Sequence, residues 1–573
     1  MQLLDDELVL SPTDLTSFAA CERLTQLELA VTRGELERPQ RDDPELDVLT
    51  RHGELHEAER LEQFKTEGKS VVEIANHVSG RADLERAEAD TLAAMRAGAG
   101  VIYQATFFDG LWRGHADYLL RVEEPSELGA WSYEVADAKL AQRVKAAALL
   151  QMCAYSEQVE RLQGVAPRQM HVITGDKLMH PFRVADYAAY YRSLKTRYLL
   201  FVADPGGEVY PDPVDHCGIC RWEAACDQRR RDDDHLSLVA RMGRDQTRKL
   251  LAARIDTMTS LAESNIAVPG IGEATLERLR DQARLQVEGA GCRPPKFALL
   301  APEPPDASGQ DRGLAGLPSP SPGDLFFDME GDPWALDGGL EYLFGVVDRV
   351  GGAPEYHAFW GHDLAGEQRA FEAFIDFVTT RRVQYPDAHV YHYAAYEQTA
   401  VKRLMGKYGT REDEVDALLR GGAFVDLYRV VLQSVQISTE GYGLKKIEAL
   451  YMERDVGAVA DGGSSIVAYE RYLESDDPRE RDEILREIAD YNRDDCESTR
   501  LLRAWLEARR PEAEREFGEI PRPTERDPEP SERVAEQDAK LEELEARLCA
   551  DVGEPDERSG AQHARWLLGQ LLH

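Results

Sequence analysis

A stretch rich in Pro, Gly and Ser, residues 291–323, divides the chain into two parts that each alternate strand-like and helical patterns. Such a composition is typical of a linker, because Pro and Gly interrupt regular secondary structure. A chain of 573 residues is also too long for one hydrophobic core. We therefore expect five parts: an α/β unit over 1–240, a helical segment over 241–290, the linker, a second α/β unit over 324–510 and a charged helical tail over 511–573.

The charge of the chain excludes one simple class of protein. The formal net charge of −38 argues against a uniformly basic nucleic-acid-binding protein, although it leaves room for a local basic surface. The acidic N-terminus lacks the positive and apolar regions of a signal peptide. No apolar run approaches the length of a membrane-spanning helix. We predict a cytoplasmic protein with no membrane partner.

Three cysteines are clustered in "HCGICRWEAAC", with the spacing C-x2-C-x5-C. In a cytoplasmic protein of this length such a cluster favours metal binding over a disulfide framework. A closed site needs a fourth ligand. His216 would complete a zinc site locally, whereas Cys21 would close a long loop and stabilise the part of the chain between the ligands.

The first unit places acidic residues on neighbouring strands. "VIYQATFFDGLWRGHADYLLRV" predicts a hairpin that turns at Asp109-Gly110 and carries Asp117 in its second strand. In "WSYEVADAKLA", Asp137 and Lys139 share one face of a strand and Glu134 points to the other. A plain ion pair is the alternative reading of the carboxylate and the lysine.

Two helical segments flank these strands. "RHGELHEAERLEQF" precedes them and contains His56. "LLQMCAYSEQVERL" follows them, with Gln151 and Tyr155 one turn apart on one face.

The order of these elements, enclosed by Cys21 and the cysteine cluster, resembles the RecB-like branch of the PD-(D/E)xK nucleases, and in particular its iron–sulfur members. The resemblance implies that Mg²⁺ or Mn²⁺ is held by His56, Asp117, Asp137 and the carbonyl of Ala138. It implies that Lys139 helps to activate the attacking water, and that Gln151 and Tyr155 position the scissile strand. It also implies a [4Fe–4S] cluster on Cys21, Cys217, Cys220 and Cys226.

The helical segment between the two units contains "IAVPGIGEATLERLRDQ", which places Gly270 and Gly272 just before a helix. It resembles a helix–hairpin–helix element, whose glycine-rich hairpin binds DNA phosphates through backbone amides without reading the sequence. A simple connection between two helices is the alternative.

The second unit begins with "GDLFFDMEGDP", in which an apolar run ends at Asp328 and Glu330. Residues two apart on a strand point to the same face, so the two carboxylates repel unless a cation lies between them. We predict further strands over 340–350 and 388–404 and helices over 366–380 and 486–506.

This second unit resembles the DEDD exonucleases of the RNase H-like fold, in the variant with a tyrosine in the last motif and most closely the YprB-type members. The resemblance assigns four carboxylates to two metal ions, namely Asp328, Glu330, Glu397 and Asp495. It assigns Tyr491 to the orientation of the attacking water. Glu397 stands where Asp is usual, which leaves the geometry of the second metal open. Asp426 is a further supporting or structural acid, and we expect Asp494 to face solvent.

The two units together predict an α/β protein with a PD-(D/E)xK restriction-endonuclease-like domain and an RNase H-like domain, joined by the helix–hairpin–helix segment. They resemble the nuclease portion of bacterial RecB-like nuclease–helicase fusions, so a helicase, in trans or as a further C-terminal domain, is an expected partner. We expect a metal-dependent DNA nuclease with two active sites that trims single-stranded or flapped ends in repair, recombination or defence. The alternatives are an iron–sulfur DNA-end-binding module with a degenerate exonuclease half, and an RNA-processing nuclease.

Overall fold

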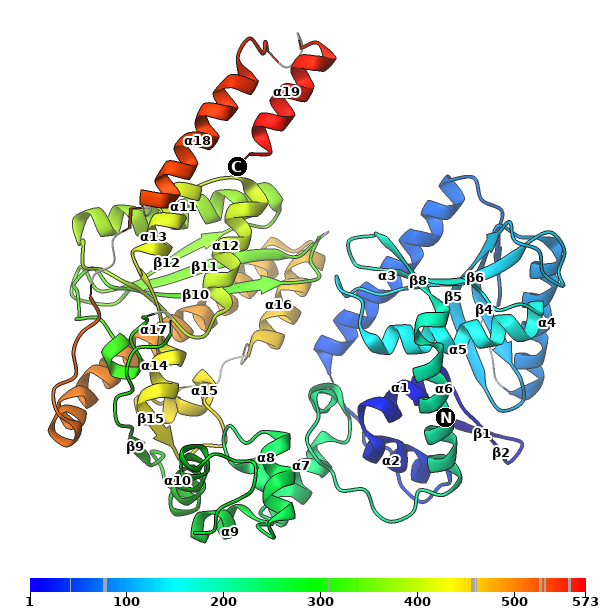
Figure 1. Ribbon diagram of the computed structural model, residues 1–573, viewed down its shortest axis with the longest axis horizontal. Coiled ribbons are helices and arrows are strands. Elements are labelled where there is room, and N and C mark those ends of the chain that lie inside the picture. The colour runs from blue at the N-terminus through cyan, green and yellow to red at the C-terminus, as the bar shows by residue number, and fades with distance from the viewer. Residues whose placement is uncertain are drawn as a thin grey trace.

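The computed structural model describes residues 1–572 except 42, 76–79, 308, 337, 455–458, 460, 525–527, 530–531 and 555–557. The chain forms two α/β lobes, each with its own sheet, and a group of green helices lies below and between them (Figure 1). No helix within the described ranges combines the length and the apolar character that crossing a bilayer requires.

The first lobe is built on a six-stranded mixed sheet in the order β3-β4-β5-β6-β7-β8. Its antiparallel hairpin of β4 and β5 turns at Asp109-Gly110, as predicted. Strand β6 pairs antiparallel with β5 and parallel with β7. The strands are β3 (Val71–Glu73), β4 (Val101–Phe108), β5 (Arg113–Val122), β6 (Ser132–Ala138), β7 (Gln169–Ile173) and β8 (Met179–Arg183), and a separate hairpin joins β1 (Gln2–Leu4) and β2 (Glu7–Val9).

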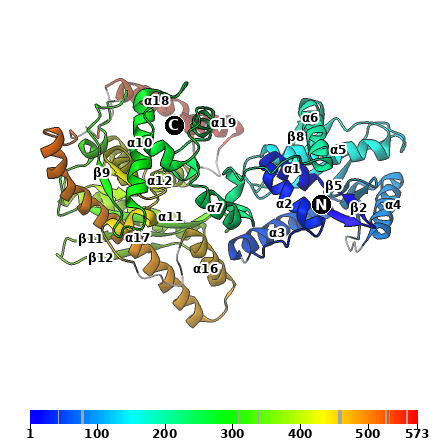
Figure 2. The same cartoon turned by 90° about the horizontal axis from the view of Figure 1, so that it is seen from below.

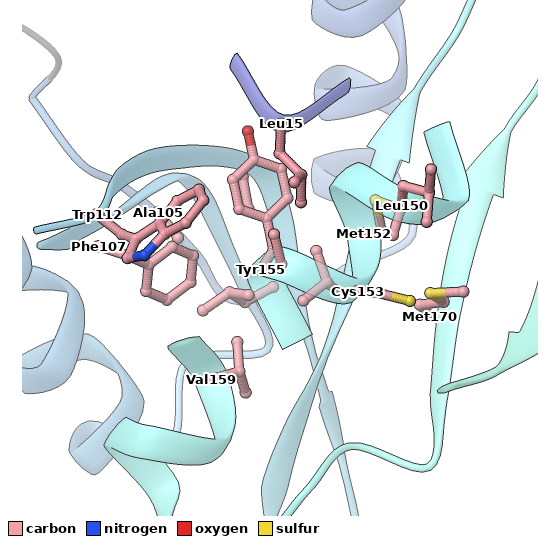
Figure 3. Close-up of a cluster of buried hydrophobic side chains, with 14 of the residues drawn as sticks. Leu15, Ala105, Phe107, Trp112, Leu150, Met152, Cys153, Tyr155, Val159 and Met170 are labelled. Atoms are coloured by element: carbon pink, nitrogen blue, oxygen red, sulfur yellow. The ribbon is translucent and has the colours of Figure 1, made fainter. Parts of the chain in front are cut away.

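The helices of the first lobe are α1 (Pro12–Ala20), α2 (Glu22–Thr32), α3 (Pro44–Thr66), α4 (Arg81–Ala97), α5 (Ala146–Gln163) and α6 (Val184–Ala203). Helix α5 packs on the sheet through apolar side chains. Its Cys153, Tyr155 and Val159 join Phe107 of β4 and Met170 of β7 in one buried cluster (Figure 3). This packing fixes the helix that carries Gln151 and Tyr155 against the strands that carry the acidic residues.

The segment between the lobes is helical. It comprises η1 (Asp215–Ile219), α7 (Glu223–Asp232), η2 (Leu236–Leu238), α8 (Arg244–Ala252), α9 (Met258–Glu263) and α10 (Glu273–Gly289). Leu250, Leu261 and Leu276 belong to a small hydrophobic core of its own.

The second lobe contains a five-stranded sheet in the order β12-β11-β10-β13-β14. Strand β10 is antiparallel to β11 and parallel to β13. Its strands are β10 (Leu325–Asp332), β11 (Leu340–Asp348), β12 (Glu355–Trp360), β13 (Val390–His392) and β14 (Phe424–Asp426). Its helices are α11 (Leu364–Gln384), α12 (Tyr396–Tyr408), α13 (Glu412–Arg420), α14 (Leu427–Ser434), α15 (Leu444–Ile447), η4 (Glu448–Leu450), α16 (Gly462–Glu474) and α17 (Pro478–Phe517).

The strand predicted over 388–404 is wrong beyond its first residues. Strand β13 ends at His392, and helix α12 begins at Tyr396. The chain turns at Ala394, which has a left-handed φ of 78°. The backbone N–H of Ala394 donates a hydrogen bond to Asp426 at 3.0 Å, which stabilises this turn. Glu397 therefore lies on a helix and not on a strand.

The stretch predicted as a linker is packed against the second lobe. Within it, β9 (Phe297–Leu299) pairs antiparallel with β15 (Val435–Ile437), and η3 (Gly313–Gly316) follows. Leu314 and Leu317 are buried in the core of the lobe. This Pro-rich segment is therefore mostly irregular in secondary structure but is packed into the second lobe, so it is not a free linker.

The two lobes touch where α3 meets α16, in both views (Figures 1 and 2). His52 Nε2 lies 2.9 Å from Oε1 of Glu470, and Arg51 lies 3.1 Å from its Oε2. Arg51 also pairs with Glu474. The tail forms a hairpin of α18 (Glu532–Cys549) and α19 (Gly560–Gln570) that projects from the body (Figure 1).

Candidate active sites

Three carboxylates converge in the second lobe. Asp328 and Glu330 come from β10, and Asp495 comes from α17, which packs on β10 and β11. One oxygen from each carboxylate lies within 4.8 Å of the others. Strand periodicity brings the first two together, and the packing of α17 adds the third, so a strand and a helix far apart in sequence build one acidic cluster.

The electrostatics of this cluster are unfavourable for three negative charges. Burial, the charge of Asp495 and the charge of Glu330 raise the pKa of Asp328 well above its ordinary value. Burial and Asp495 also raise the pKa of Glu330 to about 8, although hydrogen bonds from Ser465 and Asn492 oppose this. Removing such groups from water costs free energy unless a cation or a proton compensates them.

Several neighbours of the cluster were not identified from the sequence. Asn492 donates a hydrogen bond from Nδ2 to Oδ2 of Asp328 at 2.9 Å. Lys445 forms an ion pair with Asp495, and Arg454 lies 2.5 Å from the same oxygen of Asp495. Asn492 could have been found, because it lies between Tyr491 and Asp495 in the last motif. Lys445 and Arg454 could not, because only the tertiary fold brings their segments to α17.

Glu397 lies close to the cluster but outside the three converging oxygens. It is 4% exposed, and its charge contributes to the raised pKa of Asp328. Its Oε2 lies 3.4 Å from Nδ1 of His392. Within the described residues, neither of these two atoms has a hydrogen-bond partner.

Of the other residues predicted for this lobe, Tyr491 lies beside the carboxylate cluster, whereas Asp426 and Asp494 do not join it. Tyr491 lies one helical turn before Asp495, and burial and the charge of Asp495 raise the pKa of its hydroxyl. Asp426 caps α14 by accepting hydrogen bonds from the backbone N–H groups of Tyr428 and Arg429. Asp494 is solvent-accessible and pairs with Arg493, as expected for an acid on another face of the helix.

A second acidic cluster lies in the first lobe. Asp137 is 1% exposed and forms an ion pair with Lys139. Asp117 accepts a hydrogen bond from the backbone N–H of Ala138 at 2.8 Å. Burial and the charge of Asp137 raise the pKa of Asp117 well above its ordinary value. Burial opposes the protonation of Lys139, but the charges of Asp137 and Asp117 outweigh it and raise the pKa of the lysine.

The helices around this cluster contribute further side chains. His56 of α3 is buried, with Nε2 3.5 Å from the carbonyl oxygen of Ile173 at the end of β7. Gln151 donates a hydrogen bond to the hydroxyl of Tyr155 at 3.1 Å. Glu57, next to His56, was not identified from the sequence, although its charge reaches both Asp117 and Lys139.

Glu134 lies apart from this cluster, as the strand period predicts. Its two oxygens accept hydrogen bonds from the backbone N–H of Gln169 at 2.9 Å and pair with Nε2 of His171 at 2.8 Å. Glu134 therefore has a structural partner on the neighbouring strand β7.

The four cysteines Cys21, Cys217, Cys220 and Cys226 line one small cavity, together with Trp222 and Leu24. All four are free thiols. Two of the sulfurs accept backbone hydrogen bonds at 3.4 Å, Cys21 from Leu24 and Cys217 from Val214. Burial raises the pKa of the Cys226 thiol to about 11. His216 also lines the cavity.

The hairpin between α9 and α10 contains the two glycines singled out in the sequence. Gly270 has a left-handed φ of 82°, and Gly272 is the N-cap of α10. The carbonyl oxygen of Gly270 accepts a hydrogen bond from Lys249 at 2.9 Å. The left-handed φ at position 270 favours glycine, which adopts it without steric cost.

A third group of possible ligands, Asp348, Glu355 and His357, is compensated by the protein itself. Arg381 lies 2.6 Å from Asp348 and lowers the pKa of that carboxyl, despite its burial. We therefore assign it a structural role.

Comparison with known proteins supports the fold predicted for the second lobe. Residues 325–507 match the family model of the RNase H superfamily. No curated protein matches the chain. The RNase H-like fold predicted for the second unit is confirmed, and this fold is associated with nuclease-type phosphodiester hydrolysis. The matched range contains Asp328, Glu330, Glu397 and Asp495.

Proposed function

We propose that the second lobe is a metal-dependent exonuclease that digests nucleic acid from 3′ ends. The observation that carries this proposal is the convergence of Asp328, Glu330 and Asp495 inside an RNase H-like domain. Their donor atoms are hard carboxylate oxygens, which Mg²⁺ and Mn²⁺ prefer. Their burial and raised pKa values support a positive charge at the centre of the cluster.

Besides holding a metal ion, residues of this lobe would orient the attacking water and position the metal ligands. A divalent ion held by the three carboxylates would act as a Lewis acid on the scissile phosphate. Tyr491, on the same face of α17 as Asp495, would orient the attacking water. Asn492 holds the Asp328 carboxylate in place through its hydrogen bond. Ser465 of α16 shares a hydrogen bond of 2.7 Å with the hydroxyl of Tyr342 and also hydrogen-bonds Glu330.

The first lobe is proposed as a second, PD-(D/E)xK-type nuclease site. Asp117 and Asp137, with the carbonyl of Ala138 and the imidazole of His56, would hold the metal. The hydrogen bond between Asp117 and the N–H of Ala138 supports this, because it sets the Ala138 peptide beside the acidic pair. Lys139 would help to deprotonate the attacking water. Gln151 and Tyr155, which hydrogen-bond each other, would position the scissile strand.

The cysteine cavity is proposed to hold a [4Fe–4S] cluster. Among the described residues, no three of the four sulfurs lie within 4.8 Å of one another. A tetrahedral zinc ion with Zn–S bonds of about 2.3 Å would bring its sulfurs to about 3.8 Å apart. The wider spacing favours the larger cluster.

DNA is the proposed substrate, as single-stranded or flapped ends. The hairpin at Gly270 and Gly272 supports this, because free amides at a helix N-terminus bind phosphates without reading bases. An RNA-processing nuclease and an inactive DNA-end-binding module are the competing functions.

Digestion of end-labelled DNA and RNA with Mg²⁺ or Mn²⁺ tests the proposal. We expect DNA cleavage, with the 3′-end activity lost in an Asp328→Ala/Glu330→Ala variant and retained in Asp137→Ala. Cleavage of RNA alone would favour the processing enzyme. No cleavage of any substrate would favour the binding module.

A further inference from the structure

Three of the four proposed carboxylate ligands of the second lobe converge, and the fourth lies outside their group. Two-metal sites hold their ions about 3.5–4 Å apart between shared carboxylates. Here three oxygens converge, whereas Glu397 stands back with its Oε2 beside His392. Glu397 lies in the first turn of α12, after the turn at Ala394, whereas Asp328 and Glu330 lie on strand β10.

Two positively charged side chains, Lys445 and Arg454, form ion pairs with Asp495 of this cluster. Lys445 pairs with Asp495, and its Nζ also lies 4.6 Å from the centre of the Tyr491 ring. Arg454 contacts the same oxygen of Asp495 and is anchored by Glu448 at 2.8 Å. Lys445 and Arg454 come from the segment between β15 and α16, which no part of the acidic motif predicts.

The charges of the site balance with one divalent ion. Four ionised carboxylates, with Glu397 included, exceed one divalent ion by two negative charges. Lys445 and Arg454 supply two positive charges within the same cluster. With two divalent ions the carboxylates would be neutralised already, and the two cations would repel the metals at short range.

Resting on the proposed exonuclease function, we infer that this site takes one divalent ion instead of two, and that Lys445 supplies the positive charge that contacts the phosphate of the nucleic acid. Lys445 is suited to this role because 37% of its side chain is exposed, so a substrate can reach its ammonium. Arg454 is 14% exposed and held from two sides, so it serves to position Asp495.

Counting bound metal tests the first half of the inference without any reaction. We would titrate Mn²⁺ into the full chain by calorimetry, with Asp117→Asn and Asp137→Asn introduced to silence the first lobe. One Mn²⁺ per chain, lost in an added Asp328→Ala change, is the expected result. Two Asp328-dependent ions would overturn it.

Binding of thymidine 5′-monophosphate to the Mn²⁺-loaded protein tests the second half. Lys445→Ala should weaken this binding at least ~10-fold while Mn²⁺ affinity stays equal or rises, and Lys445→Arg should restore most of it. Lys446→Ala is the matched control, since Lys446 is the exposed neighbour, and should change nothing. Unchanged nucleotide binding in Lys445→Ala would refute the role of the lysine. If the wild-type chain cleaves no nucleic acid, the exonuclease proposal fails, yet both binding measurements still decide the inference.

Discussion

The amide of Asn492 donates a hydrogen bond to the Asp328 carboxylate, across 2.9 Å between α17 and β10. Asn492 is fully buried, and its own oxygen accepts a hydrogen bond from the hydroxyl of Tyr356 at 2.8 Å. A side chain at Gly345 would overlap Asn492 Oδ1, so β11 must carry glycine opposite this amide. The orientation of a proposed metal ligand therefore depends on a three-residue arrangement behind it.

We predict that Asn492→Asp lowers exonuclease activity at least ~10-fold and destabilises the fold by about 1–3 kcal/mol, because it replaces a buried donor with a further negative charge beside Asp328. The 3′-end digestion rate and urea unfolding measure the two effects. Asp494→Asn, on the exposed face of the same helix, is the control and should remain within two-fold.

Metal should stabilise the second lobe more at high pH than at low pH. The pKa of Glu330 is raised from 4.5 to about 8, so the folded state holds a proton that the unfolded chain has lost between these values. Without metal, stability therefore falls as pH rises through this window. Mg²⁺ binds the deprotonated carboxylates, so its effect on Tm should grow from about pH 6 to about pH 8.5. Thermal scans of the variant with Asp117→Asn and Asp137→Asn measure this, and an equal shift at both pH values would contradict it.

In the first lobe, Asp137→Ala or Lys139→Ala should abolish the activity that remains after the second site is inactivated. Removing a metal ligand or the partner of the attacking water often costs orders of magnitude in rate. Glu134→Gln is the internal control. It disturbs the pairing with His171 and should affect Tm more than rate. An inactive Glu134→Gln beside an active Asp137→Ala would reverse the assignment of the two strand faces.

Anaerobically purified protein should be brown, with broad visible absorption that Cys220→Ser removes. The change deletes one of four thiols that line the cavity. Cys153→Ser is the control, because Cys153 lies in the hydrophobic core on α5 and should leave the colour intact. Colourless protein with stoichiometric zinc would show that the cavity binds a single ion.

The contact between the lobes should depend on pH through Asp332. Burial and the neighbouring carboxyl of Glu470 raise its pKa from 3.8 to about 7. The folded state therefore favours protonated Asp332, and stability contributed by this group is lost as pH rises from about 4 to 7. Asp332→Asn keeps an oxygen for the N–H groups of Trp334 and Ala335 and should flatten this dependence. Thermal scans across this range would show it; a slope like that of the wild type would refute it.

Local spacing was sufficient to predict which side chains of β10 and of α17 lie next to each other. The two-residue period of β10 places Asp328 with Glu330, and the turn of α17 stacks Tyr491 on Asp495. The end of strand β13 could not be predicted from local spacing, because "HVYHY" has an extended pattern. The strand ends only because Ala394 adopts a left-handed φ. That conformation depends on Asp426, a tertiary contact.

The cations Lys445 and Arg454 were missed for the same kind of reason. They lie in the segment between β15 and α16, whose approach to Asp495 is set by the fold. Glu57 is different, because it directly follows His56 in "LHEAER" and could have been predicted from the sequence beside that histidine.

Helix α3 carries His52 into the contact with α16 and, one turn later, the buried His56 to the carbonyl oxygen of Ile173 at the end of β7. An α-helix rises only about 5.4 Å per turn, so these two side chains occupy adjacent turns of one stiff rod. A protein engineer who wishes to transplant the second lobe alone must replace Arg51 and His52 with new partners for Glu470, or remove that buried acid.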